Sequence, residues 1–308
     1  MDKKLETKRL WVYLAFAFGL TWIIFFAYIF SGNTWAANGE ISGMEQFVSL
    51  GMLCPALSVL LARYVTKEGF AVTGEGSMLL GISFKDKKWI YFVIAMLLPW
   101  ILFELGNGLT LLLSPGAFDA DYPAFLGIAD HEQAIICMQP IAMMITSSLV
   151  SFCAFGEEAG WRGYMMPKMV KLWGLKKAVL IGGIIWGIWH WPLTCIGHNF
   201  GRDYWGYPFT GFAAMCVMCI SSGMILTFVT YKSGSIWPAA ILHAINNSSP
   251  SILQYYINKE KMTGWRADSI GSFFIFLLPE LIIAACLYAR LRRELAAGKE
   301  LFTPGQEK

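Results

Sequence analysis

Charged residues are scarce in this chain, since Asp, Glu, Lys and Arg together make up 15% of its 308 residues. In a soluble domain they make up about a quarter of the residues. Hydrophobic residues account for 56% of the chain, and the mean hydropathy is +0.52. This composition excludes an ordinary soluble protein. It predicts a polytopic membrane protein of the all-α class, built as one helical bundle.

Disulfide, repeat and targeting signals are also missing. All seven cysteines lie in or beside apolar runs, so we expect small buried hydrophobic side chains and no disulfide framework. Cys216 and Cys219 have the spacing of a redox motif, but their apolar surroundings disfavour that role. The first apolar run, 11–30, is long enough to span a bilayer and lacks a small-residue cleavage site. We therefore expect no cleavable signal peptide.

Eight apolar runs are long enough to cross a bilayer, which takes about 17–25 residues. They are 10–30, 46–64, 89–113, 140–166, 178–196, 209–231, 235–256 and 270–289. The fourth and seventh runs also contain polar residues. We expect one membrane-embedded domain, 1–308, with about eight transmembrane helices and a polar cytoplasmic tail at 290–308.

The basic residues are unevenly divided between the two sides that these runs define. Of the 24 Lys and Arg residues, 20 fall on the side of the two termini, counting Arg162 with the region that joins the fourth and fifth runs. The other side has Arg202, Lys259, Lys261 and Arg266. Because loops rich in Lys and Arg stay in the cytoplasm, both termini are predicted to be cytoplasmic. The protein is then an integral, multi-pass protein, and we expect it in a plasma membrane.

Three charged residues interrupt the fourth apolar run. Residues 135–155 hold no charge, and Glu157, Glu158 and Arg162 then follow. An ionisable group inside a bilayer costs about 2.5–3.5 kcal/mol on insertion scales, so it usually marks function. Glu158 and Arg162 are four residues apart and can pair on a helix, whereas Glu157 points away from this pair with no local cation. We predict a supporting ion pair and a chemical role for Glu157.

Further polar residues lie within other runs. His190 lies in the fifth run, and His243 and Asn247 lie one helical turn apart in the seventh. Measured along a helix from the nearest cytoplasmic lysine, Glu157 and His243 lie at a depth of about 16 Å and His190 at about 20 Å. Residues from three helices thus converge near the middle of the membrane. We expect a water-filled cavity there that opens to the cytoplasm.

Two hydrolytic chemistries fit these side chains. Glu157 and His190 can take a proton from water and return it to a leaving amine, while His243 and Asn247 donate hydrogen bonds to an oxyanion. Alternatively, Glu157, His190 and His243 are the ligand set of a catalytic divalent metal such as zinc. The residue types alone do not separate the two.

The remaining polar and aromatic residues have simpler interpretations. Glu104 and Glu280 are intramembrane carboxylates without an evident partner, and neither is predicted to be catalytic. His198 is expected to be solvated in an external loop. Aromatic residues such as Trp161 and Trp265 are expected to lie in the interfacial belt.

Three motifs occur in order between residues 157 and 247. They are Glu157-Glu158-x-x-x-Arg162, Trp186-x-x-x-His190 and His243-x-x-x-Asn247. The ordered set resembles the CAAX-protease and bacteriocin-processing (CPBP) family of intramembrane proteases, also called the Abi or type II CAAX prenyl endopeptidase family. Trp186 stands where that family usually has Phe, from which we expect a changed pocket shape rather than lost activity.

The resemblance implies an eight-helix bundle whose cavity opens to the cytoplasm, and an endopeptidase that cuts near the C-terminus of its substrate. It assigns Glu157 and His190 to water activation and His243 with Asn247 to the oxyanion, without a cofactor; a divalent metal is the alternative. The implied partners are the bilayer and a protein or peptide, lipidated at its C-terminus in some cases, with no nucleic acid. An ion or solute transporter, or a non-catalytic bacteriocin-immunity or partner-binding protein of the same fold, are the alternative functions.

Overall fold

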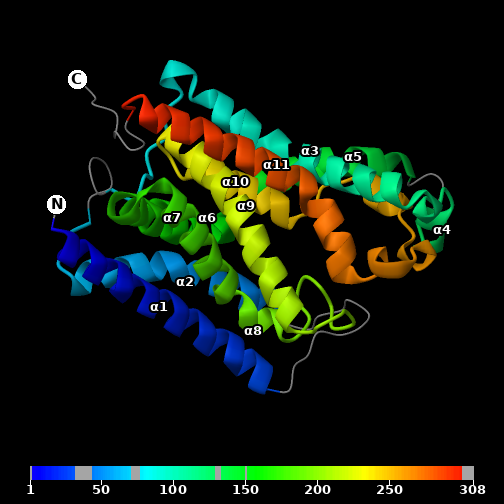
Figure 1. Cartoon of the computed structure of the whole chain (residues 1–308), viewed down its shortest axis with the longest axis horizontal. Coiled ribbons are helices and arrows are strands. Elements are labelled where there is room, and N and C mark those ends of the chain that lie inside the picture. Colours follow the sequence, from blue (N-terminus) through cyan, green and yellow to red (C-terminus); the bar gives the residue numbers. More distant parts are fainter. Residues whose placement is uncertain (1, 32–43, 71–76, 129–132, 150, 300–308) are drawn as a thin grey trace.

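The computed structural model of the protein describes residues 2–31, 44–70, 77–128, 133–149 and 151–299. Within these residues the chain is helical, and its one extended pairing is an isolated bridge between Phe118 and Ile257. Figure 1 shows the helices packed side by side as one bundle. The predicted all-α class is confirmed.

The longer helices are α1 (Lys3–Phe30), α2 (Met44–Val65), α3 (Trp89–Leu113), α5 (Gln133–Leu149), α7 (Met166–Trp189), α9 (Phe209–Ser233) and α11 (Ser269–Ala296). The shorter ones are α4 (Tyr122–Phe125), α6 (Phe152–Gly160), the π-helical turn η4 (Trp161–Met165), α8 (Trp191–Thr194) and α10 (Trp237–Asn247). Single 3-10 turns are η1 (Lys85–Lys87), η2 (Pro115–Ala117), η5 (Leu253–Tyr256), η6 (Lys259–Lys261) and η7 (Gly264–Arg266). By length and composition, six helical segments among the described residues can cross a membrane: 3–30, 47–65, 85–113, 152–189, 209–233 and 269–296. This is the pattern of a multi-pass membrane protein.

Local sequence signals set several helix ends. The carboxylate of Asp2 accepts backbone N–H groups at the start of α1, and Asp268 does the same at the start of α11. Such N-caps satisfy donors that have no partner inside the helix. At the C-terminal end of α9, Gly234 adopts a left-handed conformation, with φ of 73°, and ends the helix.

The fourth and fifth predicted runs, 140–166 and 178–196, are assembled from several pieces. Gly174 has φ of 78° and ψ of 163°, which interrupts the apolar segment 152–189. Lys168 contacts Glu6 near the start of α1, whereas the indole of Trp22, farther along α1, donates to the carbonyl of Trp189. The chain therefore turns back around Gly174, between the two predicted runs.

The seventh predicted run, 235–256, forms a helix for only part of its length. Helix α10 ends at Asn247, three residues before Pro250. A proline lacks the N–H that would continue a helix and disfavours the helical conformation of the residue before it. In the predicted tail, residues 290–296 are helical as the end of α11, and residues 300–308 lie outside the described part.

The bundle has two distinct ends, and both chain termini lie at the same one (Figure 1). At this terminal end, Lys168 bonds to Glu6 and Glu68, and Lys232 bonds to Glu294. At the opposite, distal end, the bridge joins Phe118 to Ile257, and the hydroxyl of Ser269 donates to the carbonyl of Phe200. The loops that the sequence predicts on one side of the membrane therefore lie at one end of the bundle.

Arg162 is an exception to the predicted charge distribution. The sequence assigned it to a basic loop, but it lies in η4 within the bundle and is 2% exposed. The two predictions for Arg162 therefore have different outcomes: its pairing with Glu158 is confirmed, and its loop position is wrong.

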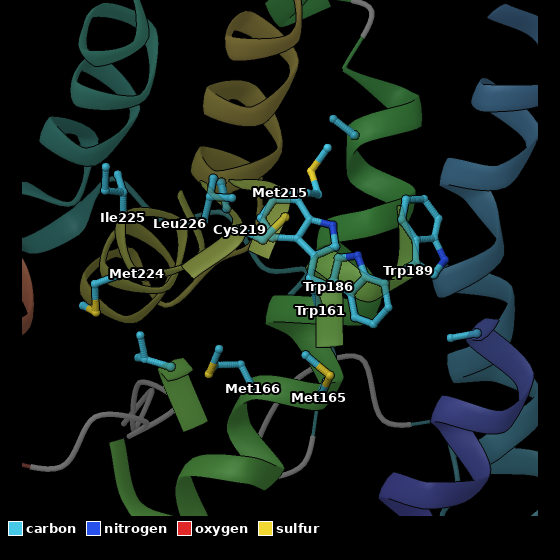
Figure 2. Close-up of a cluster of buried hydrophobic side chains, with 14 of the residues drawn as sticks. Trp161, Met165, Met166, Trp186, Trp189, Met215, Cys219, Met224, Ile225 and Leu226 are labelled. Atoms are coloured by element: carbon cyan, nitrogen blue, oxygen red, sulfur yellow. The ribbon is translucent and has the colours of Figure 1, made fainter. Parts of the chain in front are cut away.

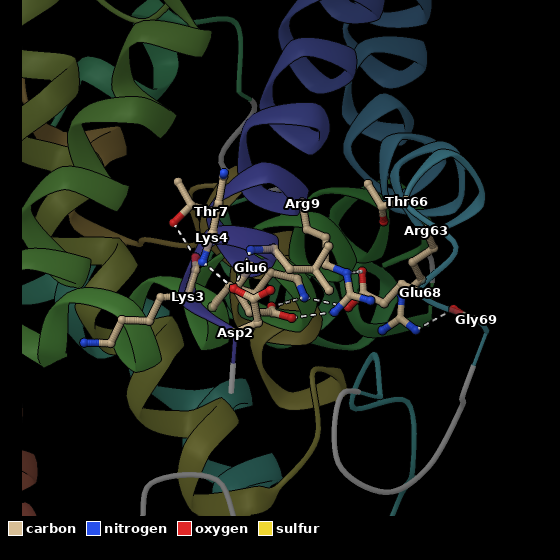
Figure 3. Close-up of polar contacts among 12 residues, drawn as sticks. Asp2, Lys3, Lys4, Glu6, Thr7, Arg9, Arg63, Thr66, Glu68 and Gly69 are labelled. Carbon is tan, nitrogen blue, oxygen red and sulfur yellow. Dashed lines mark hydrogen bonds and ion pairs between the residues drawn. The ribbon is translucent and has the colours of Figure 1, made fainter.

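The terminal half of the bundle is closely packed. Figure 2 shows Trp161, Met165 and Met166 among the buried side chains of this region. Beyond them, polar contacts join the start of α1 to the end of α2 (Figure 3), where Arg9 pairs with both Glu6 and Glu68.

Candidate active site

A cavity of about 700 Å³ lies among α2, α3, α6, α7, α9, α10 and α11. The side chains of Glu157, His190, His243 and Asn247 all line it. They come from segments separated by up to 90 positions of sequence, and the fold brings them to one space. Their positions match the predicted convergence, and their catalytic roles remain predictions.

Glu157 is held by two tryptophans. It lies in α6 and is 2% exposed. Its Oε2 accepts a hydrogen bond from Nε1 of Trp186 at 2.7 Å and another from Nε1 of Trp161 at 3.2 Å. Within the described residues no donor is bonded to its Oε1. The indoles therefore orient the carboxylate without neutralising it and leave one oxygen available for chemistry.

Neither tryptophan was assigned this role from the sequence. Trp161 was expected in the interfacial belt, but it is 1% exposed in the core. Trp186 was expected only to fill an aromatic wall, whereas its N–H is a direct partner of Glu157. The signal available in the sequence was weak: Trp161 follows Glu157 by one helical turn, a spacing at which side chains meet.

Glu158 is the centre of a buried charged group. Its Oε1 accepts from the guanidinium of Arg162 at 3.1 Å and lies 2.8 Å from Nδ1 of His243. The guanidinium also lies over the ring of Trp186, 4.1 Å from its centroid. Glu158 is thus paired to α10 as well as to its own helix, and the contact with His243 was missed because the two residues are 85 positions apart.

His190 has a defined tautomer. It follows the last residue of α7, and its Nδ1 lies 2.8 Å from the carbonyl oxygen of Trp186. A carbonyl can only accept, so Nδ1 carries the hydrogen. In the neutral ring, Nε2 then has the lone pair and can accept a proton or a water hydrogen.

The same reasoning constrains His243. When Nδ1–H donates to Glu158, the Nε2 of a neutral ring is an acceptor and cannot donate to an oxyanion. Donation from Nε2 requires the doubly protonated ring, whose Nδ1–H still donates to Glu158. Asn247 is one turn farther along α10, is exposed, and can donate from its amide in either case.

The two other intramembrane carboxylates have hydroxyl or backbone partners. Glu280 lines the cavity, and its Oε1 accepts from Ser221 and Ser222 of α9. Glu104 accepts from the hydroxyl of Ser251 and from the N–H of Leu253, and so anchors the turn that follows α10. The contacts of Glu280 join α11 to α9, and those of Glu104 join α3 to the turn after α10.

The predicted metal ligands do not fit a metal site as they are arranged. Across the described ranges, no group of three or more His, Cys, Asp and Glu side chains is placed to hold a metal ion. In the predicted set, Oε2 of Glu157 is engaged by two indoles and Nδ1 of His243 by Glu158. A site built from Glu157, His190 and His243 would need these side chains to move.

The cavity reaches the distal end of the bundle. Its lining includes His198 and Asn199 from the loop after α8, and Asn247 and Ser249 at the end of α10. The two lining side chains that are exposed, Asn199 and Asn247, both lie on this side. The opening toward the cytoplasm stays a prediction; in the fold, α7 and α10 both carry their site residues toward the distal loops.

His198 was expected to be solvated, but it forms part of the cavity wall. Burial lowers the pKa of its imidazole to about 4. The folded-state pKa is below the ordinary value, so the ring is neutral near pH 7 and adds no positive charge to the mouth of the cavity.

Comparison with known proteins finds similarity over the part of the chain that holds the site. Residues 138–249 match the family model described as type II CAAX prenyl endopeptidase Rce1-like, and this range contains all four predicted catalytic residues. The chain is 32% identical over 111 residues to CAAX prenyl protease 2 of Methanococcus maripaludis. That match covers 34% of this chain and 39% of the relative.

Proposed function

We propose that the chain is an intramembrane endopeptidase acting on a protein or peptide substrate, because its residues 138–249 match the type II CAAX prenyl endopeptidase Rce1-like family model. The observation that carries the proposal is the environment of Glu157. This buried carboxylate is fixed by two neutral donors, has no cation bonded to it, and shares a cavity with two histidines.

In the first step, Glu157 and His190 activate a water molecule. Oε1 of Glu157 and Nε2 of His190 are the two acceptor atoms left by the contacts described above. A water that donates to them attacks the scissile carbonyl, and its proton passes to one of these acceptors. The same group then delivers the proton to the leaving amine.

While the water attacks, His243 and Asn247 stabilise the oxyanion that forms from the carbonyl oxygen. A doubly protonated His243 donates from Nε2, and the amide of Asn247 adds a neutral donor. Glu158 and Arg162 together are neutral, so the extra proton on His243 gives this group one net positive charge as the oxyanion forms. Removing one such donor from an oxyanion hole costs about 10²–10³-fold in turnover.

The test compares two neighbouring substitutions. Glu157→Gln keeps an oxygen that can accept both indole N–H groups, so we expect lost turnover at nearly unchanged thermal stability. Glu158→Gln leaves Arg162 buried without its counter-ion, a change that costs about 3–5 kcal/mol in other proteins. We expect it to lower the unfolding temperature, with activity falling as a consequence.

The assay is cleavage of a library of lipidated and non-lipidated peptides by purified protein, read by mass spectrometry. Full turnover by the Glu157→Gln variant would contradict the proposed chemistry. If that variant also supports the cellular phenotype of the wild type, a non-catalytic partner-binding role takes its place.

A further inference from the structure

We propose that Glu280 forms a subsite of the cavity that binds a lysine side chain of the substrate. The proposal rests on the proposed function, because it concerns which peptides the same cavity binds. Glu280 lies outside residues 138–249, so the family match neither includes this residue nor assigns it a role. Three features carry the proposal: a carboxylate without a counter-ion, its one open oxygen, and the apolar side chains around it.

Helix α9 holds Glu280 at the wall of the cavity. Glu280 lies in α11, which runs beside α9 (Figure 1), and it lines the same cavity as Glu157 and His190. Its Oε1 accepts hydrogen bonds from the hydroxyls of Ser221 at 2.6 Å and Ser222 at 2.7 Å. Hydroxyls that donate to an ionised carboxylate lie about 2.5–2.7 Å from it. The two serines therefore stabilise the negatively charged form of Glu280.

This carboxylate has no counter-ion in the protein. Among the described residues no Lys, Arg or His pairs with Glu280, and no Lys or Arg lines the cavity. Glu158, by contrast, is paired with both Arg162 and His243. A charge inside a bilayer is costly unless it is paired. A cation that enters the cavity with the substrate would complete the pair.

Only one oxygen of Glu280 is open to a ligand. Oε1 has two lone pairs and accepts from two hydroxyls, whereas Oε2 receives no hydrogen bond from any described residue. A guanidinium binds best to both oxygens of a carboxylate at once, but an ammonium group needs a single acceptor. The arrangement therefore favours lysine over arginine.

Apolar side chains line the cavity around this carboxylate. Phe276 precedes Glu280 by one turn of α11, and Met218 and Ile225 lie one turn before and one turn after Ser222 in α9. Side chains three or four positions apart share one face of a helix. These residues offer an apolar surface to the methylene groups of a lysine whose ammonium group meets Oε2.

The subsite and the proposed catalytic residues share one cavity of about 700 Å³. This volume is typical of pockets that hold small ligands. An extended peptide advances about 3.3–3.6 Å per residue, so we expect the lysine within a few residues of the bond that is cut. Asp or Glu at that position of the peptide would meet a like charge and be disfavoured.

The first experiment measures binding and needs no turnover. The probes are two sets of fluorescent apolar peptides, which carry either lysine or norleucine at one scanned position. Their affinity for purified Glu157→Gln protein is read by fluorescence anisotropy. We expect the best lysine peptide to bind on the order of 10-fold more tightly than its norleucine counterpart, the effect of a hydrogen bond between charged groups. Equal affinities at every position would overturn the proposal.

Substitution of Glu280 tests whether it causes this preference. Glu280→Gln, added to Glu157→Gln, keeps an oxygen that accepts from both serines and removes the charge, so the preference for lysine should disappear. Glu104→Gln is the matched control, because Glu104 also accepts from a serine but does not line the cavity. An equal loss of preference in the control would overturn the subsite. Arginine peptides that bind as tightly as the lysine peptides would overturn the assignment to lysine.

Crosslinking decides the result if Glu280→Gln does not fold. A carbodiimide joins the lysine ammonium group to a carboxylate in contact with it, as an amide, and takes up the water that is released. In the Glu157→Gln protein, mass spectrometry should find the bound lysine peptide joined to Glu280. A crosslink to any other carboxylate would overturn the proposal.

Cleavage separates this proposal from the proposed function. In protein that retains Glu157, Glu280→Gln should raise KM for the lysine peptides on the order of 10-fold, with little change in kcat or in the KM of the norleucine peptides. A lysine preference in binding without any cleavage would overturn the proposed function and leave the subsite standing. Cleavage of both sets with equal KM would overturn the subsite and leave the proposed function standing.

Discussion

Adjacent glutamates have different environments because a helix places neighbouring side chains about 100° apart. Glu157 turns toward two indoles, while Glu158 turns toward Arg162 and His243. Trp186 touches both groups, through its N–H to Glu157 and through its ring beneath Arg162. This tryptophan therefore positions the carboxylate that we propose to be the base.

Trp186→Phe tests this positioning role. The substitution keeps an aromatic ring but removes the hydrogen bond to Oε2 of Glu157. A hydrogen bond to a charged group is worth about 1.5–3 kcal/mol, so we expect turnover to fall on the order of 10-fold or more with little change in KM. The measurement is steady-state kinetics at fixed pH.

Trp189→Phe is the matched control, because Trp189 is equally buried and its Nε1 has no hydrogen-bond partner among the described residues. Equal losses in both variants would mean that ring packing, and not the N–H, accounts for the effect.

His243 and Asn247 separate the two hydrolytic chemistries. If both donate to the oxyanion, His243→Ala and Asn247→Ala should each lower turnover by about 10²–10³-fold with little change in KM. A metal site would respond differently, because only His243→Ala would remove a ligand. Metal content and turnover measured together in the two variants distinguish these outcomes. A fully active Asn247→Ala variant would remove the oxyanion role of Asn247 in either scheme.

Local patterns predicted much of the helix arrangement but few of the site contacts. The pairing of Glu158 with Arg162 follows from their spacing, and so does the shared face of His243 and Asn247. The bond from Trp186 to Glu157 spans 29 positions and crosses between helices, so no periodicity reports it. The sequence also did not predict the helix ends inside apolar runs. The long stretches of hydrophobic residues favoured continuous helices and outweighed the signals of Pro250 and Gly174.

At the scale of whole helices, the close packing of α7 against α9 fixes the position of His190. A side chain at Gly183 would meet the backbone of Ile220 at 2.5 Å, and one at Gly187 would meet that of Cys216 at 2.6 Å. These glycines let the two helices approach, and His190 follows directly after this contact.

Gly183→Ala is expected to push α7 away from α9 and lower stability by about 1–3 kcal/mol. Its neighbour provides the control: a side chain at Gly182 would first meet the flexible end of Met166, at 3.1 Å, so Gly182→Ala should be tolerated. Thermal unfolding in detergent, with turnover measured in parallel, checks both. Equal stability of the two variants would show that the helices adjust to the added methyl group.

The whole molecule combines a closed, basic end with an open end that carries few charges. The six segments that can cross a membrane become seven when the passes on either side of Gly174 are counted separately, and the pass that contains α10 makes the number even. Without that turn, the loop at Arg202 and the loop at Gly234 would exchange sides. The topology of the chain therefore decides which compartment the cavity faces.

Reporter fusions test this topology. A reporter at the C-terminus and one placed after Lys232 should both report the cytoplasm, because Lys232 pairs with Glu294, near the end of α11, at the terminal end. A reporter placed after Arg202 should report the outside, because its loop contacts the start of α11 at the distal end. Alkaline phosphatase, active only outside, and a fluorescent protein, active only inside, give opposite signals at each position. If the C-terminus and Arg202 report the same side, the reversal at Gly174 is wrong. If all three positions are inverted, the charge rule fails for this chain, and the cavity faces the cytoplasm.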